Sequence, residues 1–148
     1  MGARLYETDV DRAKELLFAK KIEAIFKCQL VKLPVWAQMD FMITRGNGGV
    51  GIAELKCRNV SSAEYPTLVI GEHKLLRGME WRRIFGQVDG NKDLALMVFV
   101  RYSDSDKLVK LTTLEGLKRE KLTARNHADD PTDTEWVVHI PSERLRSF

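Results

Sequence analysis

The stretch MDFMITRGNGGVGIAELKC, residues 39–57, contains two apolar runs joined by the connection RGNGG, residues 45–49. Glycine and asparagine in such a connection are typical of a tight β-turn, so the pattern predicts an antiparallel hairpin. With the turn centred on Asn47, residues that pair across the hairpin have numbers that sum to 94. Asp40 is then expected opposite Glu54, with the two Cβ atoms roughly 5 Å apart.

The predicted pairing places two carboxylates and one ammonium group close together. Glu54 and Lys56 share a face of the second strand, at a separation of about 7 Å. Two facing carboxylates repel, and burial increases the repulsion. Either Lys56 bridges both acids in a surface network, or a divalent cation lies between them, since Mg²⁺ favours carboxylates with waters and phosphate oxygens. Converting either acid to its amide is then expected to leave the fold intact or more stable.

Residues on both sides of the hairpin complete the predicted fold. Alternation along the first strand places Met39, Phe41 and Ile43 on one face and Asp40 on the other. Helices are predicted over residues 8–27 and 72–86, the second with Gly86 as its C-terminal stop. The remaining predicted elements are strands over 28–34, 93–102, 107–114 and 135–141, a short helix over 115–125, and a final helical turn capped by Ser142. This order predicts an α/β (α+β) fold with a mixed sheet flanked by helices.

Composition narrows the class of protein. The chain has 148 residues, of which 44% are hydrophobic and 30% are charged, as is usual for one globular domain. We expect a single domain over residues 1–148, with a core of about 8–112 and a less regular tail over 113–148. No run approaches the roughly 18 apolar residues of a membrane span, and residues 1–12 lack the apolar segment of a secretory signal. A cytoplasmic protein is therefore expected.

Asp40, followed 14 positions later by Glu54-Leu55-Lys56, resembles the D…(D/E)xK core of the PD-(D/E)XK nuclease superfamily. The similarity is closest to small Holliday-junction-resolvase-like and phage-type members, in which the predicted elements follow the same order. Met39 stands where the superfamily name has proline, a relaxation that leaves the carboxylate unaffected. The resemblance implies a restriction-endonuclease-like core and a catalytically active enzyme, because all three core residues are present.

The resemblance also implies a mechanism and a set of site residues. Mg²⁺ or Mn²⁺ would be held by Asp40, Glu54 and the carbonyl of Leu55, and Lys56 would position the attacking water. A glutamate on the first helix completes such sites, and the spacing in resolvase-like members selects Glu15, with Glu23 on the same helix as the alternative. Four basic residues are expected to contact DNA; these are Lys74, Arg77, Arg58 and Arg45.

The implied activity is structure-selective DNA cleavage by an endonuclease, with junction resolution as one form of it, in a bacterial or phage-infected cell. Cutting both strands of a duplex favours a homodimer, for which Trp81, Phe85 and the stretch over 135–148 offer interface material. The alternatives are an inactive DNA-binding or assembly subunit that keeps the nuclease fold, and an exonuclease or nickase. The scattered residues His73, His127 and His139 suit no metal site.

Overall fold

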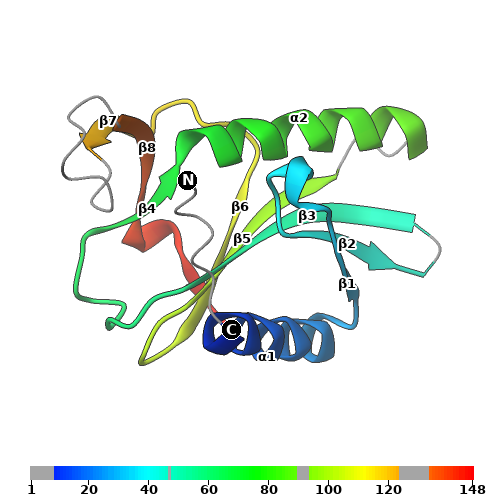
Figure 1. Cartoon of the computed structure of the whole chain (residues 1–148), viewed down its shortest axis with the longest axis horizontal. Helices are drawn as coiled ribbons and strands as arrows, with labels where there is room; N and C mark the ends of the chain where they lie inside the picture. Colours follow the sequence, from blue (N-terminus) through cyan, green and yellow to red (C-terminus); the bar gives the residue numbers. More distant parts are fainter. Residues whose placement is uncertain (1–8, 47, 90–93, 124–133) are drawn as a thin grey trace.

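A computed structural model describes residues 9–46, 48–89, 94–123 and 134–148 (Figure 1). Its two α-helices are α1 (Asp9–Phe26) and α2 (Glu72–Asp89). The larger sheet has the order β1 (Gln29–Lys32), β2 (Phe41–Arg45), β3 (Gly48–Cys57), β5 (Ala95–Arg101), β6 (Asp106–Leu111) and β9 (Arg146–Ser147). The smaller sheet has the order β4 (Thr67–Gly71), β8 (Thr134–Pro141) and β7 (Lys118–Thr123). Short 3₁₀ turns lie at Val35–Ala37 and Ser142–Arg144.

The larger sheet is mixed, because β3 and β5 run parallel while its other paired strands are antiparallel. Helix α1 and helix α2 lie on opposite sides of this sheet (Figure 1). The architecture confirms the predicted fold class, an α+β fold of the restriction-endonuclease-like type. Neither described helix combines the length and the apolar character that a membrane crossing requires.

Each helix buries a different face of β3, the central strand. On the α1 side, Phe18 and Ile22 belong to one apolar cluster with Leu55. On the α2 side, Leu75 and Ile52 belong to a second cluster, which also includes β4 and β8 residues of the smaller sheet. Because both faces are covered, β3 is almost continuously apolar. Glu54 and Lys56 are the charged residues of this strand, and Glu54 points to the α2 side and has no exposed surface.

Two predictions were wrong, one about the face on which Met39 lies and one about the residue at which α2 ends. Met39 lies in the cluster on the α2 side, whereas Phe41 and Ile43 lie on the α1 side. The cause is that β2 begins at Phe41 and residues 39–40 form a bend, so the alternation of an extended strand does not reach Met39. Gly86 does not stop α2, which continues to Asp89. A C-terminal glycine cap requires a left-handed backbone, and Gly86 does not have a positive φ.

The tail after residue 112 was predicted least well. Residues 118–123 form strand β7 rather than part of a helix, because pairing with β8 supplies backbone hydrogen bonds that the charged sequence KREKLT does not reveal. Strand β4, which lies outside this tail at residues 67–71, was also not predicted. The final helical turn exists, but Pro141 occupies its N-cap position and the Ser142 hydroxyl donates instead to the carbonyl of Tyr65.

Several of the residues that were predicted as interface material pack within the chain, although Trp136 is 44% exposed. Trp81 and Phe85 stack with ring centroids 5.4 Å apart and pack against the α2-side cluster. The indole nitrogen of Trp81 donates to the carbonyl of Ala37 at 2.8 Å. On the α1 side of the sheet, the rings of Phe148 and Phe18 stack with their centroids 6.1 Å apart. These aromatic side chains therefore complete the apolar core of a single chain.

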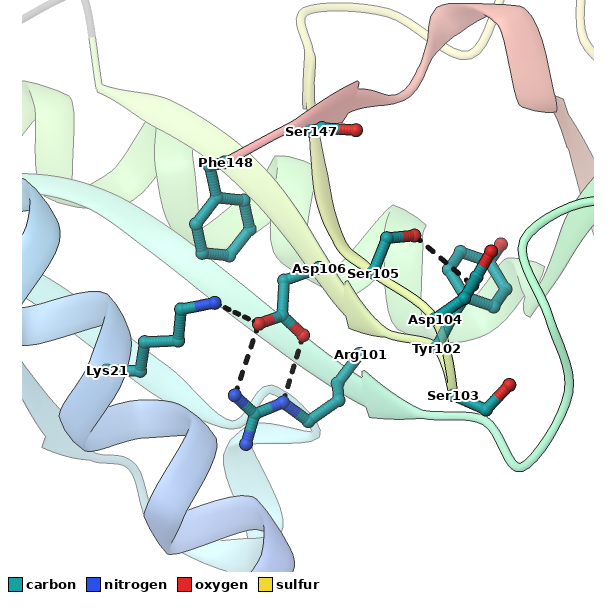
Figure 2. Close-up of a pocket in the computed structure, with 9 residues that line it drawn as sticks. All are labelled: Lys21, Arg101, Tyr102, Ser103, Asp104, Ser105, Asp106, Ser147 and Phe148. Atoms are coloured by element: carbon teal, nitrogen blue, oxygen red, sulfur yellow. Dashed lines mark hydrogen bonds and ion pairs between the residues drawn. The ribbon is translucent and has the colours of Figure 1, made fainter.

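An ion-pair cluster fastens α1 to the sheet (Figure 2). Asp106 is buried and accepts from Arg101, with Nε 2.9 Å from Oδ1 and Nη2 3.1 Å from Oδ2, and it also accepts from Lys21 of α1. Burial acts to raise the pKa of Asp106, but these hydrogen bonds outweigh it and hold the pKa below its ordinary value. The hollow of about 470 Å³ beside this cluster is lined by none of the predicted catalytic residues.

We expect Asp106→Asn to lower the free energy of unfolding by about 2–4 kcal/mol at neutral pH, since it leaves two cations without a carboxylate. The pKa of Asp106 is lowered in the folded state, so its contribution is present above the ordinary value of 3.8 and is lost as the pH falls below it. Urea unfolding at pH 7 and pH 3 measures both effects. If the free energies of unfolding of the variant and the wild type differed equally at the two pH values, the role of Asp106 as the ionised partner of both cations would be contradicted.

Candidate active site

The hairpin has the predicted register next to the site. Phe41 pairs with Ala53, Met42 with Ile52, and Ile43 with Gly51, and each pair of numbers sums to 94. A bulge between Ile43 and Thr44 shifts the pairing only toward the turn. Asn47, the predicted centre of the turn, lies outside the described residues.

Asp40 lies immediately before β2, beside the part of β3 that extends beyond its pairing with β2. Its Oδ2 accepts a hydrogen bond from the backbone nitrogen of Leu55 at 2.8 Å. The N–H and C=O groups of one strand residue point to the same side, so the strand geometry directs the Leu55 carbonyl toward Asp40 as well. A carboxylate and a backbone carbonyl are thereby brought together where β2 begins.

Glu54 is the best-buried charged group of the site. Its Oε1 lies 3.2 Å from Nζ of Lys56 and 3.1 Å from Nζ of Lys74. Its Oε2 is buried and has no hydrogen-bond partner in the described part of the chain. An unpartnered buried carboxylate oxygen is costly, and its presence in a folded protein calls for a bound water, a ligand or an ion.

The charges of the site balance as two carboxylates and two ammonium groups. Burial, and next the charge of Glu54, raise the pKa of Asp40 above its ordinary value. Burial acts to lower the pKa of Lys74, but the carboxylates of Glu54 and Asp40 outweigh it and raise this pKa. The repulsion expected between the two acids is therefore present, and Lys74 offsets it together with Lys56.

The two helix glutamates have different surroundings. Glu15 Oε1 lies 3.1 Å from Nζ of Lys32, and the same Nζ lies 3.9 Å from Oδ1 of Asp40. Glu23 lies elsewhere on α1, where its Oε2 accepts a hydrogen bond from the backbone nitrogen of Leu30 at 2.9 Å. Glu15 is thus connected to Asp40 through one lysine, whereas Glu23 holds the start of β1.

The four predicted DNA contacts do not form one group. Lys74 is in the site, and Arg77, one turn further along α2, is partly exposed and lies 3.5 Å from Glu80. Arg58 donates to the carbonyl of Val69 at 3.0 Å. Arg45 is five residues beyond Asp40 on β2, roughly 16 Å away along an extended strand, and donates to the carbonyl of Phe26.

Sequence reasoning missed two contacts of the site. The direct contact of Lys74 with Glu54 depends on how α2 crosses β3, which no local pattern encodes. The position of Lys32 was accessible in principle, because Lys32 pairs with Phe41 in the register of β1 and β2 and so lies beside Asp40.

The residues present can be tested for their fit to a divalent metal. Within the described ranges, no three His, Cys, Asp or Glu side chains gather into a metal-binding group, so the predicted ligand set that includes Glu15 is not assembled. Asp40 and Glu54 nevertheless offer the hard oxygen donors that Mg²⁺ prefers, and Mg²⁺ commonly uses one or two carboxylates with waters and phosphate oxygens. The unpartnered Oε2 of Glu54 supplies the observation that fits such an ion.

Comparison with known proteins identifies the family. A family model described as "Phage putative PDDEXK endonuclease" matches residues 2–148. Neither the comparison with curated proteins nor the comparison with solved structures gave a match. The matched range includes every residue of the candidate site. The chain therefore belongs to the phage PD-(D/E)XK endonuclease family.

Proposed function

We propose that this phage endonuclease hydrolyses DNA phosphodiester bonds with Mg²⁺ or Mn²⁺ at Asp40 and Glu54. The observation that carries the proposal is the buried and unpartnered Oε2 of Glu54. The second carboxyl group of the site, that of Asp40, has a pKa that is raised chiefly by burial. A carboxylate pair of this kind gains a favourable partner when a hard cation binds. The family match supports nuclease activity.

Each side chain has a task in this proposal. Asp40, Glu54 and the Leu55 carbonyl hold the ion, which when bound polarises the phosphate and lowers the pKa of a coordinated water. Lys56 orients the attacking water and offsets the charge that develops on the phosphate oxygens. Lys74 pairs with Glu54 and orients it, and with Arg77 it contacts the phosphates of the bound strand.

The form of the DNA substrate and the assembly of the enzyme are further parts of the proposal. We propose that the DNA is selected by its structure rather than by its sequence. Cutting both strands of a junction or duplex is most simply done by a homodimer with two sites. Sedimentation at micromolar concentration tests the dimer, and a chain that stays monomeric on DNA would contradict it. The proposed place of action is the cytoplasm of an infected bacterial cell.

The assay for the proposed function compares DNA forms and metals. Linear, nicked, single-stranded and four-way-junction DNA are incubated with the purified chain and Mg²⁺, Mn²⁺ or excess chelator. We expect cleavage with either metal, internal products, and a preference for branched or unpaired DNA. Cleavage in excess chelator would exclude the metal mechanism. Binding without cleavage under all conditions would establish the inactive DNA-binding subunit, and mononucleotide products would establish an exonuclease.

The helix glutamates are distinguished by a pair of matched variants. We propose that Glu15 assists the site through Lys32, so Glu15→Gln is expected to lower the cleavage rate by about 10- to 100-fold. Glu23→Gln weakens the hydrogen bond to Leu30 and is expected to lower stability by about 1 kcal/mol with little effect on cleavage. Rates and thermal melting of both variants are measured together. The opposite pattern would transfer the role to Glu23.

A further inference from the structure

A groove of about 900 Å³ opens beside the candidate active site, between the end of β3 and the smaller sheet. Lys56 lines it, so the groove begins at a proposed catalytic residue. Strands β4, β8 and β7 supply its floor, and the loop that connects β3 to β4 supplies part of its wall. We refer to this space as the side groove.

The floor of the side groove is apolar. Val69, Val137 and Leu122 line it. His139 also lines it, but both of its ring nitrogens have partners, with Nδ1 2.8 Å from the hydroxyl of Thr67 and Nε2 2.9 Å from Oε1 of Glu120. The floor therefore presents carbon atoms, and the polar atoms of His139 do not require a ligand.

The walls of the side groove carry aromatic rings and cations. Tyr65 is 61% exposed, and Tyr102 lines the same space. Arg58 and Lys118 contribute two positive charges, against the carboxylate of Glu135 among the lining residues. Lys56 is a third cation that is paired with Glu54. Apolar surface and exposed rings suit the flat face of a nucleobase, while the excess of cations suits a phosphate. A peptide segment would gain nothing specific from this excess of positive charge unless it were acidic.

The size of the side groove restricts what can enter it. Its volume falls in the range of sites that hold a small molecule or a cofactor. A volume of about 900 Å³ equals that of a cube about 10 Å on edge. A DNA duplex is wider than this, because its major groove alone is about 12 Å wide. A single nucleotide that has left the base stack is small enough.

We propose that the side groove binds an unpaired nucleotide of the DNA substrate adjacent to the phosphate that is cut. The base stacks on Tyr65 above the apolar floor, and the flanking phosphates lie against Arg58 and Lys56. Unpaired or easily unpaired nucleotides occur at branches, flaps and nicks, so this groove gives the enzyme its selectivity for DNA structure. The proposal rests on the proposed nuclease function, because the groove is placed relative to that site.

The test measures binding separately from cleavage. Fluorescence anisotropy in Ca²⁺, which replaces Mg²⁺ so that cleavage does not interfere, gives the affinity for a short duplex with a few unpaired nucleotides at one end. A second DNA is identical except that the unpaired nucleotides lack their bases. We expect removal of the bases to weaken binding by wild type about tenfold or more, the range that stacking of one base provides. Tyr65→Ala should bind both DNAs equally weakly, whereas Tyr65→Phe, which keeps the ring, should behave as wild type.

A second variant guards against an indirect effect of Tyr65→Ala. Leu122→Glu places a carboxylate on the floor of the side groove from a partly exposed position, where it disfavours the apolar face of a base, and should also remove the preference for bases. If wild type binds both DNAs with equal affinity, the proposal is wrong. Cleavage in Mg²⁺ without any preference for bases would leave the nuclease function standing and overturn the groove alone. A preference for bases without cleavage would support the groove and overturn the nuclease function.

Discussion

Asp40→Asn is expected to abolish DNA cleavage and, at the same time, to make the metal-free protein more stable. The loss of activity, by about 10³-fold or more, follows because the amide removes a charged ligand from the proposed ion site. The gain in stability follows because burial and the charge of Glu54 raise the pKa of Asp40 in the folded state. A group with a raised pKa stabilises the folded state below its ordinary value of 3.8, and this stabilisation is lost as the pH rises through the folded pKa.

The melting temperature measures the sign of this effect. At pH 7 and in the presence of chelator, Asp40→Asn should melt a few degrees above wild type. Near pH 3 the two proteins should melt together, because Asp40 is then protonated in both folded and unfolded states. A large loss of melting temperature at pH 7 would instead support a structural role for Asp40, as a member of a surface network. The wild type with excess Mg²⁺ provides the control, since the ion should reverse the order.

Glu54→Gln is expected to abolish cleavage to a similar extent but to change stability in the opposite direction. Glu54 has no exposed surface, and its Oε1 lies within 3.2 Å of the ammonium groups of both Lys56 and Lys74. Replacing the carboxylate by an amide leaves two neighbouring cations without their common partner. Removing one member of a buried ion pair costs about 3–5 kcal/mol, and the partial exposure of both lysines reduces this to about 2–3 kcal/mol.

A double variant separates the charge effect from a packing effect. Glu54→Gln combined with Lys74→Gln removes one cation together with the carboxylate, so it should recover part of the lost stability. It should not recover any cleavage, because the ion site still lacks a carboxylate. If Glu54→Gln were as stable as wild type, or if adding Lys74→Gln lowered stability further by its full single-variant amount, the proposed pairing of Glu54 with Lys74 would be wrong.

The stability changes expected for Asp40→Asn and Glu54→Gln have opposite signs, and this difference illustrates what the sequence could and could not predict. The hairpin register, with pairs summing to 94, followed from the turn residues and the period of two along a strand. It placed Asp40 opposite Glu54, and in the structure Asp40 lies just before β2 and accepts a hydrogen bond from the backbone nitrogen of the next residue, Leu55. From that register alone, both amide variants were expected to relieve repulsion. The expectation for Glu54 changes because Lys74 reaches it from α2, a helix that begins 18 residues later in the chain. The crossing of a helix over a strand is decided by tertiary packing.

The tail illustrates a different limit. Strand β8 was predictable because its apolar residues include Val138 and Ile140, which pack into the core. Strands β4 and β7, which were missed and misassigned, form hydrogen bonds to β8 from both sides. The run TLVIG over 67–71 is mostly apolar and rich in β-branched residues, follows Pro66 and ends at Gly71, so its pattern is that of a strand and was overlooked. The run KREKLT over 118–123 carries no such pattern, and the position of the side groove depends on the pairing of both strands with β8.

The most direct test of the account is the binding of Mn²⁺ to the metal-free protein, followed by electron paramagnetic resonance. We expect wild type to bind Mn²⁺, Mg²⁺ to displace it, and binding to weaken at lower pH because Asp40 must lose its proton. Asp40→Asn and Glu54→Gln should each weaken binding by about tenfold or more, while Asp106→Asn, which alters the other carboxylate cluster, should bind Mn²⁺ as wild type does. Binding of Mn²⁺ with equal affinity by wild type and Asp40→Asn, or no binding by wild type, would contradict the assignment of Asp40 and Glu54 as the metal site.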